Sequence, residues 1–450
     1  MAMLAYDADE LNDLLERRQF RKLRETMEEM NEVDIAEFIE ELESEKKVLV
    51  YRMLPKELAA DVFSFLEVDD QEHIINSITD YELGKIIEDL QVDDAVDMLE
   101  ELPAIVVKRV LQNASPDTRN LINEFLQYPE NSAGSIMTAE YIGLKRNMTV
   151  EQAFAYIREN GVDKETIYTC FVTDSKRRLQ GVVTVKDLLM NPYNTVIKDI
   201  MDENIIYAVT TEDREDVVDT FNKYDLLCLP VVDHENRLVG IVTVDDAVEV
   251  MEQEATEDFE KMAAMLPSEK PYLKTGIFEI AKNRLPWLIV LMFVSIVTGA
   301  ILTHYEHALT VMPLLLSFVP MVMDTSGNCG NQSSTTVIRG MSVGDIELGD
   351  MPKVWWRELR VGIVCGAVLA AAEFVYLMIR YPHQLMVNLT VMFTLLCTVI
   401  IAKSIGCLLP MIARRLKLDP TIMAAPLITT IVDACSLLIF FNFACAFLSL

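Results

Sequence analysis

The sequence predicts a multi-domain membrane protein with an all-α superhelical N-terminal domain, an α/β domain, a long linker helix and a five-helix transmembrane domain. Three observations predict this architecture. Acidic charge is concentrated in the front of the chain, apolar segments of membrane length fill the back, and two different internal repeats divide the front. We expect the domain boundaries at residues 1–129, 130–250, 251–280 and 281–450.

A short acidic and apolar unit recurs in the first domain. It occupies residues 35–42, 59–66, 83–90 and 95–102, and its closing leucines fall 24, 24 and 12 residues apart. One such unit cannot bury its apolar face alone, so consecutive units are expected to stack. The repeat therefore predicts short helices that form a small superhelix.

A longer repeat occupies residues 136–250. Residues 179–188 recur at 238–247, an offset of 59, and the Ile-Met pair at 136–137 recurs at 200–201. In each unit, a run of β-forming residues precedes a glycine. A threonine and then an aspartate follow that glycine. This pattern strongly resembles a pair of cystathionine-β-synthase (CBS) modules, which form a pseudo-symmetric α/β unit and often bind adenine nucleotides.

The threonine and aspartate of each CBS unit have two interpretations. The resemblance implies that they hold the ribose of a nucleotide such as ATP. The same residue types also cap the turn from a strand into a helix, and the sequence favours neither interpretation. The residues concerned are Thr184 and Asp187 in the first unit and Thr243 and Asp246 in the second.

The back of the chain contains five apolar segments, and a bilayer-spanning helix needs about 20 residues. The segments are 285–305, 309–338, 354–380, 387–412 and 421–449. Lysine and arginine flank the N-terminal side of the first segment and the loops that follow the second and the fourth. The positive-inside rule therefore places the acidic half in the cytosol and the C-terminus outside.

Two apolar segments contain residues that are rare at membrane depth. Proline, glycine and amide side chains are tolerated there only where they line protein or water, and a carboxylate is a functional-site hypothesis. We therefore predict two broken helices that form a cation path. The first interruption, residues 320–332, includes Asp324, and the second, residues 425–433, includes Asp433.

Charge and composition exclude several classes of function. Residues 1–270 carry 27 basic and 60 acidic groups, a balance of −33, whereas the rest carries 12 and 10, a balance of +2. Such acidity disfavours nucleic acid as a partner and favours divalent cations as counter-charge. The eight cysteines form no CxxC pair, so we interpret them as small apolar residues, and no nucleophile–base constellation indicates an enzyme.

The order of these parts resembles the MgtE family of bacterial magnesium channels. Matching motifs are the Ser-Ala-Gly-Ser-Ile-Met-Thr run at 132–138, Arg-Leu-Pro-Trp at 284–287, the Gly-Asn stretch at 327–332 and Leu-Asp-Pro at 418–420. The resemblance implies a homodimer in the lipid of the bacterial inner membrane, with its pore on the dimer axis. It also implies a magnesium channel that closes when cytosolic Mg²⁺ binds between the N domain, the CBS pair and the linker helix.

The resemblance places Asp433 in the ion-selectivity site. Because magnesium gives up its water reluctantly, two copies of this carboxylate would hold a hydrated ion. The alternative is a structural ion pair with Lys403. Family members often carry a polar residue where this chain has Ala425. Because alanine offers no side-chain ligand, ion binding in this chain is assigned mainly to Asp433. Further pore-lining candidates are Asp324, Asn328, Asn331, Gln332, Asp419, Ala425 and Pro426. For the three amides, packing between helices is an equally good interpretation. For Asp419, capping of a helix is an equally good interpretation.

The resemblance also implies regulatory magnesium ligands in the acidic half. Asp93 and Asp97 lie four residues apart, on one face of a helix, where like charges repel. Alone, each acid would be interpreted as a solvated surface charge. The full predicted set is Asp61, Asp93, Asp97, Asp213, Glu215, Asp225, Asp246, Glu249, Glu254, Glu257 and Asp258.

Two other functions fit a CBS-regulated membrane protein. An anion or organic-solute transporter should offer basic or aromatic groups at its helix breaks, whereas these segments offer acids and amides. A membrane sensor that transports nothing would have no use for buried polar residues. The sequence favours the magnesium channel over both.

Overall fold

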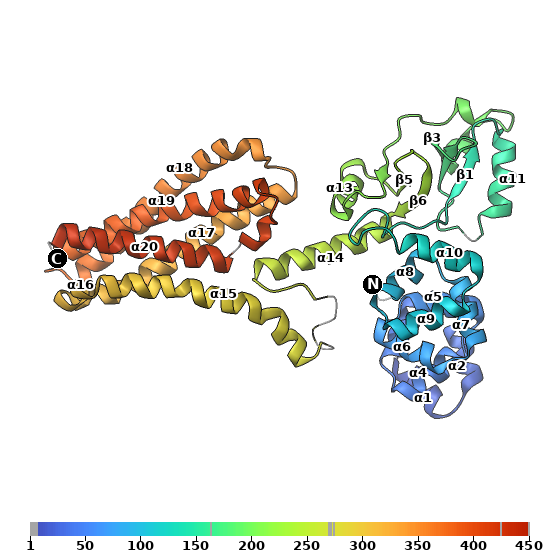
Figure 1. Cartoon of the computed structure of the whole chain (residues 1–450), viewed down its shortest axis with the longest axis horizontal. Coiled ribbons are helices and arrows are strands. Elements are labelled where there is room, and N and C mark those ends of the chain that lie inside the picture. The colour runs from blue at the N-terminus through green and yellow to red at the C-terminus, as the bar shows by residue number, and fades with distance from the viewer. Residues whose placement is uncertain (1–7, 163, 269–271, 273–274, 424, 449–450) are drawn as a thin grey trace. The chain divides into compact units, whose positions relative to one another are not determined.

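The computed structural model describes residues 8–162, 164–268, 272, 275–423 and 425–448. The chain divides into two compact units, residues 1–252 and 253–450. The division falls inside one helix, α14 (Val244–Met262). Each unit is described by itself below (Figure 1).

From residue 8 on, where the described part of the first unit begins, the chain forms a stack of ten short helices. Alternate helices pack in series: α3 contacts α5, α5 contacts α7 and α7 contacts α9, while α6 contacts α8 and α8 contacts α10. Of the closing leucines of the repeated unit, Leu42, Leu66 and Leu102 are buried and Leu90 is partly buried against the same core. The helices are α1 (Ala8–Glu16), α2 (Phe20–Met27), α3 (Glu32–Glu40), α4 (Ser44–Tyr51), α5 (Lys56–Ser64), α6 (Val68–Ser77), α7 (Asp80–Asp89), α8 (Val92–Glu101), α9 (Ala104–Asn113) and α10 (Pro116–Phe125).

Two copies of one α/β motif follow. In each copy the first strand pairs in parallel with the second, which pairs antiparallel with the third. The sheets are β1 (Ile142–Lys145), β2 (Thr169–Thr173) and β3 (Leu179–Thr184), then β4 (Ala208–Val209), β5 (Cys228–Val232) and β6 (Leu238–Thr243). The helices are α11 (Val150–Asn160), α12 (Val185–Met190), α13 (Arg214–Tyr224) and the start of α14, with the 3₁₀ turn η1 (Ile197–Asp199).

The two repeated motifs of this domain contact each other crosswise. A Cβ at Gly181 would lie 2.7 Å from Sδ of Met201, and a Cβ at Gly240 would lie 2.7 Å from Sδ of Met137. Each glycine thus makes room for the methionine of a repeated Ile-Met pair. This exchange is the pseudo-symmetry that the 59-residue offset predicts.

The second unit is a bundle of long helices. Helix α19 (Leu385–Arg415) packs against α17 (Val319–Ser342), α18 (Met351–Arg380) and α20 (Ala425–Leu448), and α15 (Ile277–His304) packs mainly on α20. Among the described residues, four helical segments are long and apolar enough to cross a membrane, and they contain α15, α18, α19 and α20. The shorter elements are α16 (Glu306–Val311), η2 (Pro313–Phe318), η3 (Leu348–Asp350) and η4 (Pro420–Met423).

The prediction of a broken helix at residues 320–332 is wrong. This stretch lies inside the continuous helix α17, and the interruption comes earlier, where α16 gives way to η2. Pro320 sits in the first turn of α17, where a missing N–H costs nothing. The glycines stay helical because neighbouring helices pack closely on them, as Gly330 does against Ile428 and Val432.

The prediction of a second broken helix, at residues 425–433, is also wrong. Ala425 begins α20 and Pro426 lies in its first turn, so the helix carrying Asp433 is uninterrupted. Proline fits the first turn of a helix because its fixed φ is already helical. The linker helix was predicted at residues 251–280, whereas the helix after the CBS pair, α14, begins at Val244 and ends at Met262. Residues 269–271, 273 and 274 of the predicted range lie outside the described residues.

Candidate functional site

One face of α17 carries polar side chains that the second unit leaves exposed. Asp324, Asn328 and Gln332 follow one another at intervals of four residues, and all three are exposed. The Nδ2 of Asn328 donates to Oδ2 of Asp324 over 3.3 Å. The buried residues of the same helix are mainly small or apolar, among them Ser326, Gly327, Gly330 and Ser333. The helix is therefore amphipathic inside an apolar bundle. We call Asp324, Asn328 and Gln332 the polar face of α17.

Helix α20 adjoins α17 through its polar residues. The Nδ2 of Asn331 donates to Oγ1 of Thr429 over 3.1 Å, so this amide joins two helices. Asp433 lies one turn after Thr429, and its Oδ1 is buried with no hydrogen-bond partner among the described residues. The carboxylates of Asp324 and Asp433 are close enough to interact electrostatically. The structure thus brings together the two acids that the sequence predicted for a cation path.

Lys403 makes contacts elsewhere. Its side chain is 4% exposed, and Nζ lies 3.3 Å from Oγ of Ser333. The same hydroxyl lies 2.5 Å from Oε2 of Glu358. Among the contacts of the described residues, none joins Lys403 to Asp433, so the alternative of an ion pair between them is wrong.

The remaining pore-lining candidates lie at the start of α20. The carbonyl oxygens of Ala425 and Pro426 accept hydrogen bonds from the hydroxyls of Thr429 and Thr430, at 2.8 and 2.9 Å. Asp419 accepts from the backbone N and the hydroxyl of Thr421 through Oδ1. Asp419 therefore caps the turn η4, as one of its two interpretations predicted.

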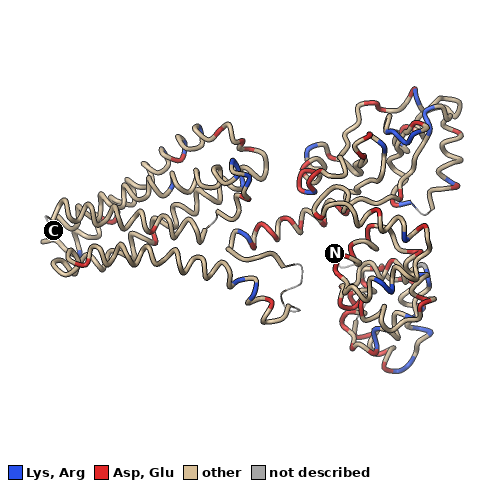
Figure 2. The backbone as a smooth tube through the Cα atoms, viewed as in Figure 1, with Lys and Arg blue, Asp and Glu red and all other residues tan. Residues whose placement is uncertain are grey.

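Acidic side chains converge between α8 and the first part of α14. Oδ1 of Asp93 is buried without a hydrogen-bond partner in the described chain. Burial, followed by the charges of Asp94 and Asp246, raises the pKa of Asp93 well above its ordinary value. Figure 2 shows the acidic residues along these helices. The main members are Asp61, Asp93, Asp94, Asp97, Glu140, Glu165, Asp246 and Glu249, which we call the interdomain acidic cluster.

The pKa values of two members of this cluster report burial first and mutual repulsion second. Desolvation raises the pKa of Asp94 to about 7, assisted by the charges of Asp246, Glu165 and Glu249. Desolvation also raises the pKa of Asp97 to about 7, assisted by Glu100 and Glu249. Among the described residues, no three acidic, histidine or cysteine side chains are close enough to hold a metal ion as they stand.

Three members of the cluster were not predicted. Asp94 follows Asp93 directly, so the pair of adjacent acids was a usable signal. Glu140 and Glu165 had no such signal, because folding of the first CBS unit brings them close to α8 and α14. Glu165 is itself partly buried, and burial raises its pKa.

The end of α14 carries a second group of predicted acids. Burial raises the pKa of Asp258, and the charge of Asp419 adds to the shift. Glu254 and Glu257 contribute in the same sense. A cation is also present: Nζ of Lys261 lies 2.8 Å from Oδ2 of Asp419 and pairs with Glu257 one turn earlier.

Of the other predicted acids, Asp213 and Asp225 cap α13, and Glu215 lies in its first turn. Asp213 is the N-cap, where Oδ1 accepts the backbone N–H of Glu215 over 2.9 Å. Asp225 ends the helix in the left-handed conformation, with φ 51° and ψ 46°. Aspartate tolerates this conformation better than most residues.

The threonine and aspartate of each CBS pair bond to each other at the start of a helix. Oγ1 of Thr184 donates to Oδ2 of Asp187 over 2.5 Å, and Oγ1 of Thr243 donates to Oδ2 of Asp246 over 2.5 Å. In the first pair, the backbone N–H of Asp187 also bonds to the threonine hydroxyl. The capping interpretation is therefore realised in the first unit. In the second unit, Oδ2 of Asp246 accepts from the backbone N–H and the hydroxyl of Thr243.

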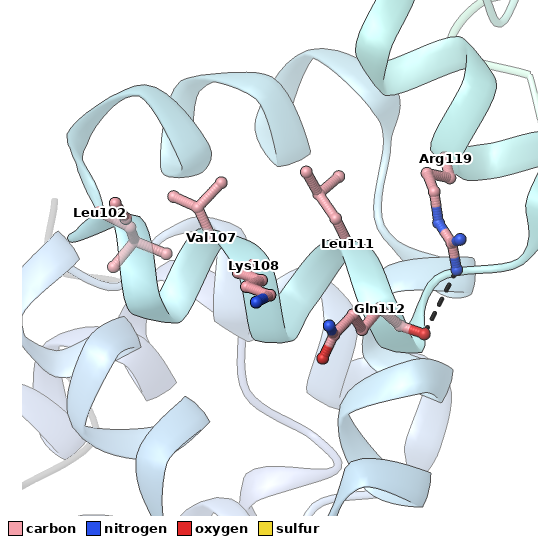
Figure 3. A pocket seen from close by; sticks show the side chains of 7 residues that line it. Leu102, Val107, Lys108, Leu111, Gln112 and Arg119 are labelled. Carbon is pink, nitrogen blue, oxygen red and sulfur yellow. Dashed lines mark hydrogen bonds between the residues drawn. The ribbon is translucent and has the colours of Figure 1, made fainter.

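One hollow of the first unit lies away from all these residues. It has a volume of about 490 Å³ and lies between α9 and α10, where Leu102, Val107 and Leu111 form its apolar wall (Figure 3). Arg119 at its edge donates to the carbonyl oxygen of Gln112 over 3.3 Å. None of the predicted site residues lines it.

Comparison with known proteins follows the same domain order. The family model of the MgtE intracellular N domain matches residues 30–131, and the CBS domain model matches residues 133–193 and 197–253. The MgtE model, described as a divalent cation transporter, matches residues 319–443. The magnesium transporter MgtE of Thermus thermophilus is 36% identical over 445 residues, 97% of each chain. The chain belongs to the MgtE family.

Other MgtE proteins agree with this assignment. The magnesium transporter MgtE of Bacillus subtilis is 32% identical over 92% of this chain and 94% of its own. A crystal structure of the cytosolic domain of the Mg²⁺ channel MgtE in complex with ATP is 37% identical, with a TM-score of 0.52, and covers 54% of this chain and 100% of that one. The soluble part of a magnesium transporter gives 30% identity, a TM-score of 0.53 and 55% and 98% coverage.

These similarities confirm the predicted fold class of a helical N domain and a CBS pair followed by membrane-capable helices. They also confirm that the chain is a transporter and not an enzyme, since the MgtE family model describes a transporter.

Proposed function

We propose that this chain conducts Mg²⁺ across the bacterial inner membrane, with Asp433 as the ion-binding carboxylate of the pore. The observation that carries the proposal is the buried oxygen of Asp433 without a hydrogen-bond partner in the described chain, beside Asp324 on α17. An uncompensated carboxylate in an apolar bundle is strongly unfavourable. A passing cation supplies the missing compensation. The named relatives are magnesium transporters.

The side chains at this place suit a hydrated ion. Mg²⁺ prefers six oxygen ligands at about 2.0–2.1 Å and keeps its waters. Asp433, Asp324 and the amides of Asn328 and Gln332 offer acceptors around water molecules, and they are too few on one chain to replace the hydration shell. If Mg²⁺ binds through its water molecules, the pore needs acidic side chains but no complete set of protein ligands around the ion.

The pore lies between two copies of the chain. The polar face of α17 is exposed in the single chain, and polar side chains at membrane depth need protein or water as neighbours. A homodimer that places two such faces opposite each other creates a water-filled path and doubles the acidic groups. The surrounding apolar helices contact lipid.

Magnesium in the cytosol closes the pore through the interdomain acidic cluster. Two like charges about 4 Å apart near a protein surface repel by roughly 4 kcal/mol. In the absence of metal this repulsion separates α8 from α14, and Mg²⁺ bound between them favours the compact, closed state. Linkage requires that closing raises the affinity for the ion by the same factor.

ATP binds at the CBS pair in this proposal. The related cytosolic domain is described in complex with ATP. The second carboxylate oxygens of Asp187 and Asp246 remain available for ribose hydroxyls while the first oxygens hold their threonines. The acidic half faces the cytosol and the C-terminus lies outside, in accord with the positive-inside rule.

Flux measurements test the pore. The protein is reconstituted in liposomes loaded with a magnesium-sensitive dye, and wild type is compared with Asp433→Asn. We expect the variant to lose at least about tenfold in initial rate, because the amide cannot balance a cation. Asp345→Asn, a matched change at an exposed acid between α17 and α18, should keep the wild-type rate.

Three other outcomes would contradict parts of the proposal. Flux that does not depend on Asp433 would move the ion site to Asp324 or the amides. Flux of anions or organic solutes without Mg²⁺ would favour the solute transporter. No flux of any kind from a folded protein would favour a sensor.

A further inference from the structure

The end of α14 carries an ammonium group among carboxylates. In the unit formed by residues 253–450, Lys261 pairs with Glu257 on its own helix and with Asp419 at the start of η4. The side chains of Lys261 and Glu257 are each 25% exposed, and that of Asp419 is 29% exposed. We call these three residues the linker ion pair. It joins a helix and a turn that are more than 150 residues apart in the sequence.

Asp419 is held in place for this contact. Its Oδ1 accepts the backbone N–H of Thr421 over 2.8 Å and the threonine hydroxyl over 2.5 Å. Its Oδ2 is therefore directed to Lys261, 2.8 Å away. A carboxylate whose orientation is fixed loses little side-chain entropy when it forms an ion pair, so the contact is stronger than that of two freely rotating surface groups.

The charges at the end of α14 differ from those of an empty metal site, because an ammonium group lies among the carboxylates. Nζ of Lys261 lies 2.8 Å from Oδ2 of Asp419 and also pairs with the carboxylate of Glu257. The site of Glu257, Asp258 and Asp419 therefore already contains a positive charge. A divalent cation that enters between Glu257 and Asp419 must displace the ammonium group.

We propose that Lys261 is a tethered cation that joins the linker helix to the start of the last membrane helix and replaces a regulatory magnesium ion at this contact. An ammonium group on the chain is present at every magnesium concentration and needs no octahedral ligand set. The contact between α14 and η4 therefore persists without magnesium. Dependence on magnesium then resides mainly in the interdomain acidic cluster. The regulatory role of this contact rests on the proposed function, whereas the contact itself does not.

A distance measurement on the full-length protein in lipid nanodiscs tests this inference without flux. Spin labels are attached at the exposed positions Phe259 and Leu418 through a noncanonical keto amino acid, which leaves the native cysteines in place. Pulsed electron resonance gives the distance distribution in EDTA and in Mg²⁺. The variants are Lys261→Gln, the charge exchange Lys261→Asp with Asp419→Lys, and the control Lys353→Gln, which removes an exposed ion pair with Asp350.

We expect one short distance in wild type, both in EDTA and in Mg²⁺. Lys261→Gln should shift the equilibrium toward longer distances in EDTA by about three- to fivefold, the effect of one partly exposed ion pair, and Mg²⁺ should restore the short distance. The charge exchange should restore it in EDTA, which a merely misfolded variant would not do. Lys353→Gln should behave as wild type.

Two results would overturn the inference. One is a distribution for Lys261→Gln in EDTA that equals wild type. The other is a wild-type distribution that is long in EDTA and short only in Mg²⁺. A short distance that depends on Lys261 in a protein without magnesium flux would retain the tethered cation and reject the proposed function, so the two failures are distinguishable.

Discussion

Gly330 of α17 and Gly406 of α19 bring two helix backbones of the membrane unit into direct contact. A Cβ added at Gly406 would overlap the carbonyl oxygen of Gly330 and would lie 3.2 Å from its Cα. A Cβ at Gly330 would lie 3.0 Å from Ile428 of α20. Small residues allow such close packing of helices in membranes. This contact fixes α17, and with it the polar face that carries Asp324.

Gly406→Ala should therefore destabilise the membrane unit by about 1–3 kcal/mol, the usual effect of overpacking a close contact. The free energy of unfolding is measured by SDS titration in mixed micelles. Gly299→Ala on α15 is the matched control, because a Cβ there meets nothing within 4 Å. The control includes the gain in helix propensity from glycine to alanine. Equal stability of the two variants would show that the helices move apart freely.

Repeats and spacing were sufficient to predict much of this fold. Three of the four closing leucines of the helical repeat are buried, and the two glycines of the CBS pair have their period because each meets a methionine of the other unit. The continuity of α17 was not predictable in the same way. Glycine and proline weaken a helix locally, and only the packing of Gly330 against Gly406 shows that they do not break it here.

The sequence predicted only part of the candidate site, because some of its residues come together only in the folded chain. Asp433 stands out in the sequence as a carboxylate in an apolar segment, whereas Asp93 was assigned only through the family resemblance. Both have a buried oxygen without a hydrogen-bond partner in the described chain. Lys261 did not stand out, since its partner Asp419 lies far away in the sequence. Neither did Glu140 and Glu165, which reach α8 only through the fold of the first CBS unit.

The double variant Asp93→Asn with Asp97→Asn should need a higher cytosolic magnesium concentration for closure. Both acids belong to the interdomain acidic cluster, and coupling between ion binding and a conformational change is typically worth about 1–3 kcal/mol. We expect the concentration that halves flux to rise about fivefold or more. Asp69→Asn with Asp117→Asn, at exposed acids of the same domain, should leave it unchanged. Unaltered inhibition in the first pair would refute its role.

The same cluster predicts a dependence on pH. The pKa values of Asp94 and Asp97 are about 7 when α8 contacts α14, against an ordinary value of about 3.9. The contact therefore binds protons that the separated helices do not bind. It is most stable at low pH, loses stability as the pH rises from about 4, and has lost the whole contribution above about 7.

Hydrogen exchange of α8 in EDTA measures this effect. After correction for the intrinsic exchange rate, α8 should be better protected at pH 6 than at pH 8, and Mg²⁺ should remove most of the difference. Helix α3, which carries no member of the cluster, is the internal control. Asp94→Asn with Asp97→Asn should reduce the pH dependence. Equal protection of α8 at both pH values would mean that burial and repulsion do not favour protonation of these acids in the contact.

Lys403 and Asp433 should contribute independently to stability. Lys403 contacts Ser333, which in turn contacts Glu358, and among the described residues no contact joins it to Asp433. Residues that share no partner give additive effects within about 0.5 kcal/mol. A double-mutant cycle with Lys403→Met and Asp433→Asn should therefore show an interaction energy below this value.

A second cycle, Lys403→Met with Glu358→Gln, is the positive control. Both residues meet at the hydroxyl of Ser333, so their effects should depart from additivity by about 0.5–3 kcal/mol. A large interaction energy in the first cycle would instead show that Lys403 compensates Asp433. The unbalanced charge at Asp433 would then disappear, and with it the physical reason for a cation at that place.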